Sequence, residues 1–198
     1  MSYSRRTFLE TSLGALALAA FRPAFAVAGG VPAGLLRRAL SALDSHGDSI
    51  EHRDVVGIAD FSLPSYAPRF HLVTLASGGV TSHLVAHGKG SDPRRTGWLE
   101  HFSNEPRSHA TSAGAYRTGG LYVGAHGPAL HLEGLDPTNS EAASRAIVVH
   151  GAWYVSRQMI VQYGMLGRSE GCLAVADSSL NEILTRLGPG RLIYADRA

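Results

Sequence analysis

The stretch 144–175 constrains the fold more than any other part of this 198-residue chain. The apolar run 147–149 ends at His150, which is typical of a buried strand that carries a polar side chain at its end. The only cysteine, Cys172, follows Gly171, a small residue that lets another backbone come close. Cys172 and His150 are 22 residues apart, so any contact between them must be tertiary.

The chemistry that this pair suggests is attack of a thiol on a carbonyl. A thiolate is the reactive form of cysteine, and a neighbouring imidazole can take its proton. The backbone N–H groups of Gly171 and Cys172 could then stabilise an oxyanion. The alternative is an inert buried thiol beside a hydrogen-bonded core histidine. The glycines and the charged Arg168 in the approach to Cys172 favour the reactive thiol.

The sequence resembles the murein L,D-transpeptidase catalytic domain family, a branch of the YkuD-like L,D-transpeptidases. His150-Gly151 and Ser169-Xaa-Gly171-Cys172 form the family signature. Further segments match in the same order, and the resemblance runs from about residue 55 to 196. The matching segments are Val85–Gly90, Phe102–Asn104, Gly124–Gly127, Arg145–Ser156 and Gly167–Val175.

The resemblance implies a mainly β fold with peripheral helices, a mixed β-sandwich of the L,D-transpeptidase catalytic domain type. It implies Cys172 as nucleophile, His150 as base and the Gly151 carbonyl as the group that orients the imidazole. It implies no cofactor. Two positions depart from the wider family, because Glu170 replaces a histidine and Ala174 an arginine. These departures affect how the donor substrate would be recognised.

The implied function is an exported cysteine acyltransferase that acts on peptidoglycan stem peptides and forms 3→3 cross-links. The same chemistry with water as acceptor would make the protein an L,D-carboxypeptidase, or another cysteine peptidase or amidase. A third alternative is a non-catalytic murein-binding domain. Glu170 supports that alternative, since a negative charge beside Cys172 should raise the pKa of the thiol.

Several other residues are candidates for the substrate site. His87 and His126 each precede a glycine, as His150 does, and we expect both to line the cleft. Three such pairs could also suggest a metal, but no HExxH motif or paired cysteine spacing is present, and we predict no metal. Ser169 is expected to shape the loop or bind substrate, and Tyr154 to form a wall of the pocket.

Two arginines have predicted partners. Arg168 matches the geometry of a substrate carboxylate. Arg145 is placed four residues after Glu141, which predicts a helical ion pair between them.

The first residues resemble an export signal. Arg5 and Arg6 precede an apolar run at 13–21 that is too short to span a membrane, and Ala24-Phe25-Ala26 has the form of a signal peptidase site. We predict a twin-arginine signal peptide at 1–26 and a single catalytic domain at 27–198. A Sec signal and an uncleaved anchor are the alternatives. All three place the protein in the periplasm or cell envelope.

Composition excludes some partners. A net charge of +2 gives no argument for nucleic acid binding, and 44% hydrophobic residues are enough for a core. A single cysteine cannot form an intramolecular disulfide. We expect no transmembrane span in the mature chain, and the sequence leaves the oligomeric state open.

Hydrophobic periodicity predicts the elements. Helices are expected at about 31–44, 139–146 and from Asp177, with Asp177 capping its own helix. Strands are expected at 55–61, 69–76, 80–87, 115–118, 121–124, 130–135, 147–150 and 191–195. Gly78-Gly79 favours a hairpin between the second and third strands.

Overall fold

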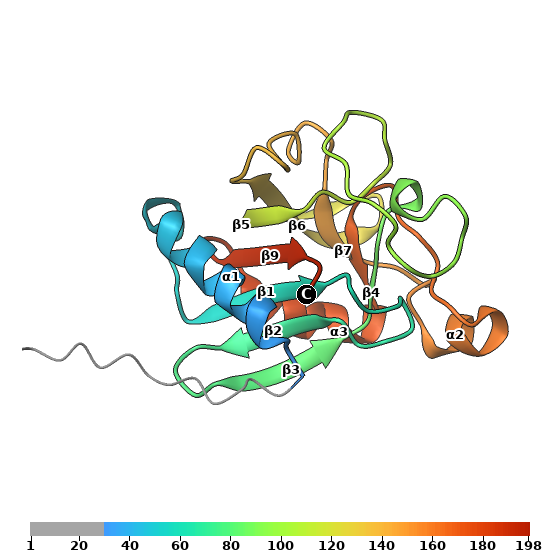
Figure 1. Cartoon of the computed structure of the whole chain (residues 1–198), viewed down its shortest axis with the longest axis horizontal. Helices are drawn as coiled ribbons and strands as arrows, with labels where there is room; N and C mark the ends of the chain where they lie inside the picture. The colour runs from blue at the N-terminus through green and yellow to red at the C-terminus, as the bar shows by residue number, and fades with distance from the viewer. Residues whose placement is uncertain (1–29) are drawn as a thin grey trace, which may run out of the picture.

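A computed structural model describes residues 30–198 of the chain (Figure 1). The predicted signal peptide at 1–26 lies outside these residues. The helices are α1 (Ala33–Ser45), α2 (Arg157–Tyr163) and α3 (Asp177–Leu187), with short 3₁₀ turns at Gly47–Ser49 and Lys89–Ser91. The strands are β1 (Val55–Asp60), β2 (Phe70–Thr74), β3 (Gly79–His83), β4 (Val85–Ala86), β5 (Gly114–Gly124), β6 (Gly127–Gly134), β7 (Val148–Gly151), β8 (Leu173–Val175) and β9 (Leu192–Asp196).

The nine strands form one mixed sheet in the order β3-β2-β1-β9-β5-β6-β7-β8-β4. The β1–β9 and β7–β8 pairs are parallel, and the other pairs are antiparallel. Only Leu84 separates β3 at one edge of the sheet from β4 at the other. The sheet must therefore curl until its two edges lie side by side, which gives the layered appearance in Figure 1.

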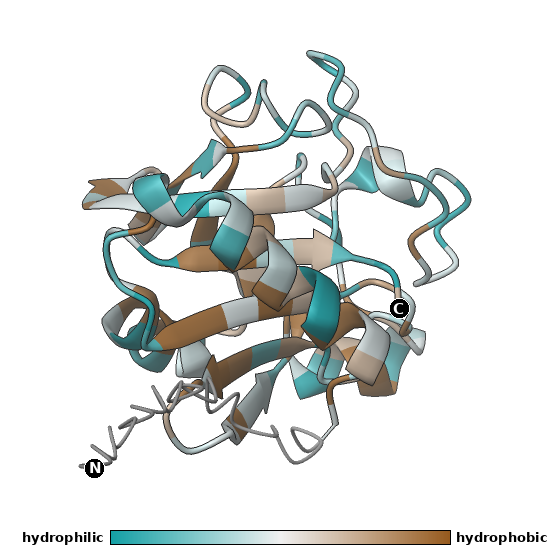
Figure 2. Cartoon of the chain, turned by 60° about the vertical axis from the view of Figure 1, so that its left-hand side comes forward, coloured by the Kyte–Doolittle hydropathy of each residue, from teal (hydrophilic) through white to brown (hydrophobic). Residues whose placement is uncertain are grey.

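The curled sheet encloses the main core on its inner face. All strands except β3 contribute residues to it, including Phe70 of β2, Leu130 of β6 and Leu173 of β8, and α3 adds Ile183. A second core lies between α1 and the outer face of β1 and β9, so both faces of β1 are covered. Figure 2 shows this arrangement as apolar strands beneath α1. The mainly β fold with peripheral helices is confirmed.

The predicted hairpin is present. β2 and β3 pair antiparallel across the Gly78-Gly79 turn, with Thr74 opposite Gly79. The strand predicted at 80–87 is divided into β3 and β4, because β4 leaves the hairpin and pairs with β8. The strands expected at 115–118 and 121–124 are one strand, β5, with a register shift between Thr118 and Leu121. Gly119 and Gly120 therefore form a bulge and not a turn.

The helix predicted at 139–146 is wrong, and the segment is a series of turns. The Asn139 side chain is buried, accepting a hydrogen bond from the Asp136 N–H (2.9 Å) and donating to the Ala115 carbonyl (2.7 Å). It therefore ties two turns together and caps no helix. The segment ends at Ala146, whose φ of 52° is incompatible with a helix.

Two further helix predictions need correction. Helix α2 was not predicted, although Ser156 caps its start and Gly164, in the left-handed conformation, ends it. Helix α3 begins at Asp177 as expected, but its N-cap is Ala176 and no side chain caps it. The Asp177 carboxylate lies instead against Gly151. None of the helices in the described part of the chain is long and apolar enough to cross a membrane.

We predict that Asn139→Ala destabilises the protein by about 1–3 kcal/mol, because it leaves the Asp136 N–H without a partner and removes one of the two hydrogen bonds to the Ala115 carbonyl, which also accepts the Leu135 N–H. Urea unfolding should show a lower midpoint with an unchanged slope. Asn181→Ala, on the exposed face of α3, is the matched control. Equal midpoints for the two variants would contradict the role assigned to Asn139.

Candidate active site

The parallel pair β7–β8 brings Cys172 and His150 to one place. Val149 lies opposite Leu173, and His150 lies opposite Ala174. Because side chains alternate along a strand, Cys172, one residue before β8, lies on the same face as Ala174 and His150. No hydrogen bond joins Sγ to the imidazole within residues 30–198, and such contacts are often long in unliganded active sites.

The imidazole of His150 has a defined orientation. Its Nδ1 donates a hydrogen bond to the Gly151 carbonyl at 2.8 Å, which is the contact predicted from the sequence. A carbonyl can only accept, so the neutral ring carries its proton on Nδ1 and leaves Nε2 free to act as a base. Burial lowers the pKa of His150, and the Gly151 hydrogen bond opposes this shift. The resting imidazole is therefore neutral.

His126 lies directly beside this imidazole. Its ring stacks on that of His150 with centroids 4.9 Å apart and an angle of 26° between the planes. It comes from the exposed turn between β5 and β6, whereas His150 belongs to β7. The charge of His126, when protonated, adds to the lowering of the His150 pKa.

His87 does not line the cleft, and this prediction is wrong. Its side chain is 1% exposed, and its Nδ1 lies 2.7 Å from the guanidinium of the buried Arg69. Its Nε2 lies 3.5 Å from Asp92. Burial, followed by the charge of Arg69, lowers the pKa of His87 to about 4. His87 reaches the site only through its backbone carbonyl, which accepts a hydrogen bond from the Ser169 N–H at 3.0 Å.

Ser169 organises the loop in front of the thiol. Its hydroxyl donates to the Cys172 carbonyl at 2.7 Å and accepts the Gly171 N–H at 3.1 Å. The prediction that the Gly171 N–H faces a substrate oxyanion is therefore wrong, because Ser169 occupies that donor. Of the two predicted donors, the Cys172 N–H remains.

Close glycine packing and backbone hydrogen bonds fix the loop that carries Cys172. Gly88 packs so closely on Gly171 that a side chain at Gly88 would meet backbone atoms, and Gly171 has a φ of 123°. The Lys89 N–H donates to the Ser169 carbonyl at 2.7 Å. The buried Thr111 hydroxyl accepts from the Gly88 N–H (2.9 Å) and donates to the Gly171 carbonyl (3.2 Å). These contacts fix the backbone that presents the thiol.

Arg145 orders the long loop at 101–113. It makes no ion pair with Glu141, contrary to the sequence-based prediction. Its guanidinium donates instead to the Ser103 carbonyl (2.8 Å) and to the Ser112 hydroxyl (2.7 Å). It also lies close enough to Cys172 for its charge to lower the pKa of the thiol. Sequence spacing could not reveal this role, because the partners are more than 30 residues away.

Arg168 connects two loops. One guanidinium nitrogen donates to the backbone carbonyl of Asp92. Arg168 therefore ties the thiol loop to the segment that follows β4, and its binding of a substrate carboxylate stays a prediction.

Tyr154 lines a cavity beside His150 and lies near Cys172. Its ring covers Gly167, where a side chain would collide with it. Burial, together with the nearby Cys172, raises the pKa of Tyr154 to about 12. The phenol is therefore neutral at physiological pH.

Glu170, the first departure from the wider family, is paired on both sides. Its carboxylate lies 2.7 Å from Lys89 Nζ and 2.5 Å from His109 Nδ1. The three side chains form an exposed cluster at the edge of the thiol loop. The Lys89 ammonium group therefore compensates the negative charge of Glu170.

The thiol itself is protonated at rest. Cys172 Sγ lies 3.6 Å from the carbonyl oxygen of Ala146, to which the S–H can donate. Burial raises the pKa of Cys172, the Val148 N–H and Arg145 oppose this shift, and Glu170 adds to it. Cys172 and His150 thus start as a neutral thiol and a neutral imidazole.

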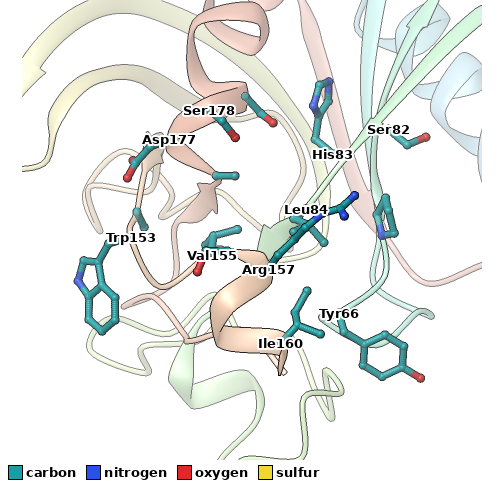
Figure 3. Close-up of a pocket in the computed structure, with 15 residues that line it drawn as sticks. Tyr66, Ser82, His83, Leu84, Trp153, Val155, Arg157, Ile160, Asp177 and Ser178 are labelled. Carbon is teal, nitrogen blue, oxygen red and sulfur yellow. The ribbon is translucent and has the colours of Figure 1, made fainter. Parts of the chain in front are cut away.

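Three cavities lie in this part of the molecule, and one of them is lined by His150. The His150 pocket measures about 290 Å³ and is lined by His126, His150, Gly151, Ala152, Trp153, Tyr154 and Asp177. The Arg145 pocket, on the other side of the thiol loop, measures about 560 Å³ and is lined by Pro106, Arg107, His109, Glu141, Ser144, Arg145 and Glu170. The largest, about 640 Å³, is the α2 pocket between α2, the start of α3 and the β3–β4 segment (Figure 3).

The described histidines do not form a metal centre. Among residues 30–198, no three His, Cys, Asp or Glu side chains lie close enough together to hold a metal ion. His126 and His150 stack on each other, and His87 lies apart in the core beside Arg69.

Several solved structures are similar to this chain, although their sequence identity to it is low. A helical cell shape determining protein from Campylobacter jejuni is 13% identical with a TM-score of 0.49, over 84% of this chain and 57% of that one. An L,D-transpeptidase from Mycobacterium smegmatis is 14% identical with a TM-score of 0.44, over 72% and 58%. L,D-transpeptidase 3 from Mycobacterium tuberculosis, solved with a faropenem-derived adduct, is 13% identical with a TM-score of 0.46, over 73% and 60%.

These TM-scores are too low to carry an argument, and the chain spans less than two thirds of each of these structures. No curated protein sequence matches the chain. The family model described as "L,D-transpeptidase catalytic domain", in contrast, matches residues 28–195, which is most of the sequence. The chain belongs to the L,D-transpeptidase catalytic domain family.

Proposed function

We propose that this protein is an exported cysteine acyltransferase that acts on peptidoglycan stem peptides and forms 3→3 cross-links through a thioester on Cys172. The observation that carries the proposal is the β7–β8 pairing, which places Cys172 on the same face as an imidazole held through Nδ1 by Gly151. This is the arrangement that a thiol nucleophile and its base require. Family membership supplies the substrate class.

In the first step, His150 Nε2 takes the thiol proton as Sγ attacks the carbonyl of the L-centre of the third residue of a tetrapeptide stem. The Cys172 N–H is the donor available to the oxyanion. When the tetrahedral intermediate collapses, the C–N bond breaks and His150 returns the proton to the amine of the leaving D-alanine. The product is a thioester on Cys172.

In the second step, the amine of another stem attacks the thioester and releases the thiolate. If water attacks instead, the product is a tripeptide and the activity is that of an L,D-carboxypeptidase. Both outcomes use the same two residues.

The neutral states of Cys172 and His150 are relevant to the alternative that the protein is a non-catalytic murein-binding domain. A thiol whose pKa is raised by burial reacts slowly by itself, and proton transfer to His150 must accompany its attack. The hydrogen bond from Nδ1 to Gly151 leaves His150 Nε2 without a proton, and this favours concerted activation of the thiol.

We predict that Cys172→Ala abolishes acyl-enzyme formation while the fold survives, because Cys172 is the only nucleophilic thiol. Residues 27–198 would be incubated with a disaccharide-tetrapeptide, and intact-protein mass spectrometry and D-alanine release would be followed. A 3→3 dimer would show transfer, and a tripeptide alone would show hydrolysis. Turnover in Cys172→Ala, or an unmodified wild type with no D-alanine released, would overturn the proposal.

We predict that Glu170→Gln lowers the pKa of Cys172, because it removes a negative charge that disfavours the thiolate. The midpoint of iodoacetamide alkylation against pH should move to lower pH, with faster alkylation below that midpoint. Glu133→Gln, an exposed change on β6, is the control and should leave the curve in place. A midpoint that stays or rises in Glu170→Gln would contradict this electrostatic assignment.

Export by the twin-arginine route stays a prediction from the sequence. Replacing Arg5 and Arg6 together by lysine should retain the full-length precursor in the cytoplasm, since the receptor reads the arginine pair. Fractionation with an N-terminal mass measurement checks both the location and cleavage after Ala26. Normal export of the double variant would favour the Sec alternative.

A further inference from the structure

The α2 pocket lies next to the His150 pocket. The two cavities share Ala152, Trp153 and Asp177 in their linings. Trp153 is 74% exposed and lies between them, packed edge-on against Tyr154 with ring centroids 5.8 Å apart. A ligand that reaches from one cavity into the other therefore passes Trp153 without entering the core.

The charges in the α2 pocket have opposite signs at its two ends. Asp177 belongs to the wall shared with the His150 pocket. Arg157 extends from α2 toward the side of the pocket that holds His83 and Leu84 (Figure 3). Arg157 is exposed, and none of the ion pairs within residues 30–198 involves it. The pocket thus offers an uncommitted cation at a distance from the thiol and a carboxylate near His150.

The remaining walls suit a peptide. Leu84, Val155 and Ile160 supply apolar surface between the charges, and Ser156 and Ser178 supply hydroxyl groups. A ligand matched to these walls carries an amine at one end, a carboxylate at the other and aliphatic groups between them.

The chemistry of the second step places the acceptor on the His150 side of Cys172. The base that protonates the leaving amine must also take the proton of the attacking amine, by reversal of the same step. An attacking amine therefore approaches through the His150 pocket. The rest of an acceptor peptide then continues past Trp153 into the α2 pocket.

We propose that the α2 pocket binds the acceptor stem peptide, with Arg157 holding a carboxylate of that peptide and Asp177 guiding its ammonium group toward His150. This assignment rests on the proposed function and names the subsite for its second substrate. The donor stem then takes the opposite side of the thiol, toward the Arg145 pocket.

Attack of the acceptor amine on the thioester needs no further reagent, because every bond and proton is accounted for. The acceptor ammonium loses one proton to water, and the neutral nitrogen attacks the thioester carbonyl. A C–N bond forms, the second amine proton passes to His150 Nε2, and the C–S bond breaks. The imidazolium then returns its proton to the thiolate and restores the neutral pair.

The test separates the two half-reactions. The acyl-enzyme is formed with a tetrapeptide donor and followed by intact-protein mass spectrometry, and an amine-bearing tripeptide stem is then added. We expect Arg157→Gln to lower the second-order rate constant for acceptor attack by about ten- to a hundredfold, as expected for a lost hydrogen bond to a charged group. Acyl-enzyme formation and the rate of hydrolysis without acceptor should stay within about twofold, since Arg157 does not touch Cys172.

Two controls make the result specific to the carboxylate. Arg37→Gln on α1 is the matched variant, because Arg37 is also an exposed helical arginine and lines none of the three cavities. An acceptor with amidated carboxylates should react equally well with the wild type and with Arg157→Gln. An unchanged rate of acceptor attack in Arg157→Gln would overturn the assignment. An absence of acyl-enzyme in the wild type would instead overturn the proposed function, and this inference with it.

Discussion

The parallel pairing of β7 with β8 is the contact on which the active site depends. It connects two segments whose critical residues are 22 positions apart, and its register decides which face each side chain occupies. A slip of one residue would turn Cys172 away from His150, because side chains alternate along a strand. The pair lies inside the sheet, between β6 and β4, so its neighbours on both sides hold the register.

The backbone around the thiol is held by contacts that come from distant parts of the chain. Ser169 and Thr111 use their hydroxyl groups to fix the loop itself, and Arg145 fixes the segment that covers it. Within residues 30–198, three of the four non-glycine residues with positive φ belong to this region, namely Arg107, His109 and Ala146. Such conformations persist only where surrounding contacts hold them, and they are concentrated at functional sites. The conformation of the loop therefore depends on hydrogen bonds from side chains that are distant in the sequence.

Electrostatics at the candidate site favour a neutral thiol beside a neutral imidazole. Burial raises the pKa of Cys172 and lowers that of His150, so neither carries a charge at rest. A protonated thiol is less prone to oxidation than a free thiolate. Glu170 strengthens this effect, and its pairing with Lys89 and His109 limits it.

Sequence alone was sufficient for the features that depend on local pattern and on motif. Periodicity located α1, the β2–β3 hairpin, β7 and β9, and the His150-Gly151 motif predicted the hydrogen bond that joins the imidazole to the Gly151 carbonyl. Prediction from the sequence failed where a side chain forms hydrogen bonds with residues that are far away in the sequence and not with its sequence neighbours. Asn139 ties turns together and starts no helix, and Arg145 binds a loop 33 to 42 residues before it in place of Glu141. His87 shares the His-Gly pattern of His150 but is buried beside Arg69, and Ser169 takes the Gly171 N–H. Local preference and motif are encoded within a few residues, whereas burial and hydrogen-bond partners are settled only when the curled sheet brings distant segments together.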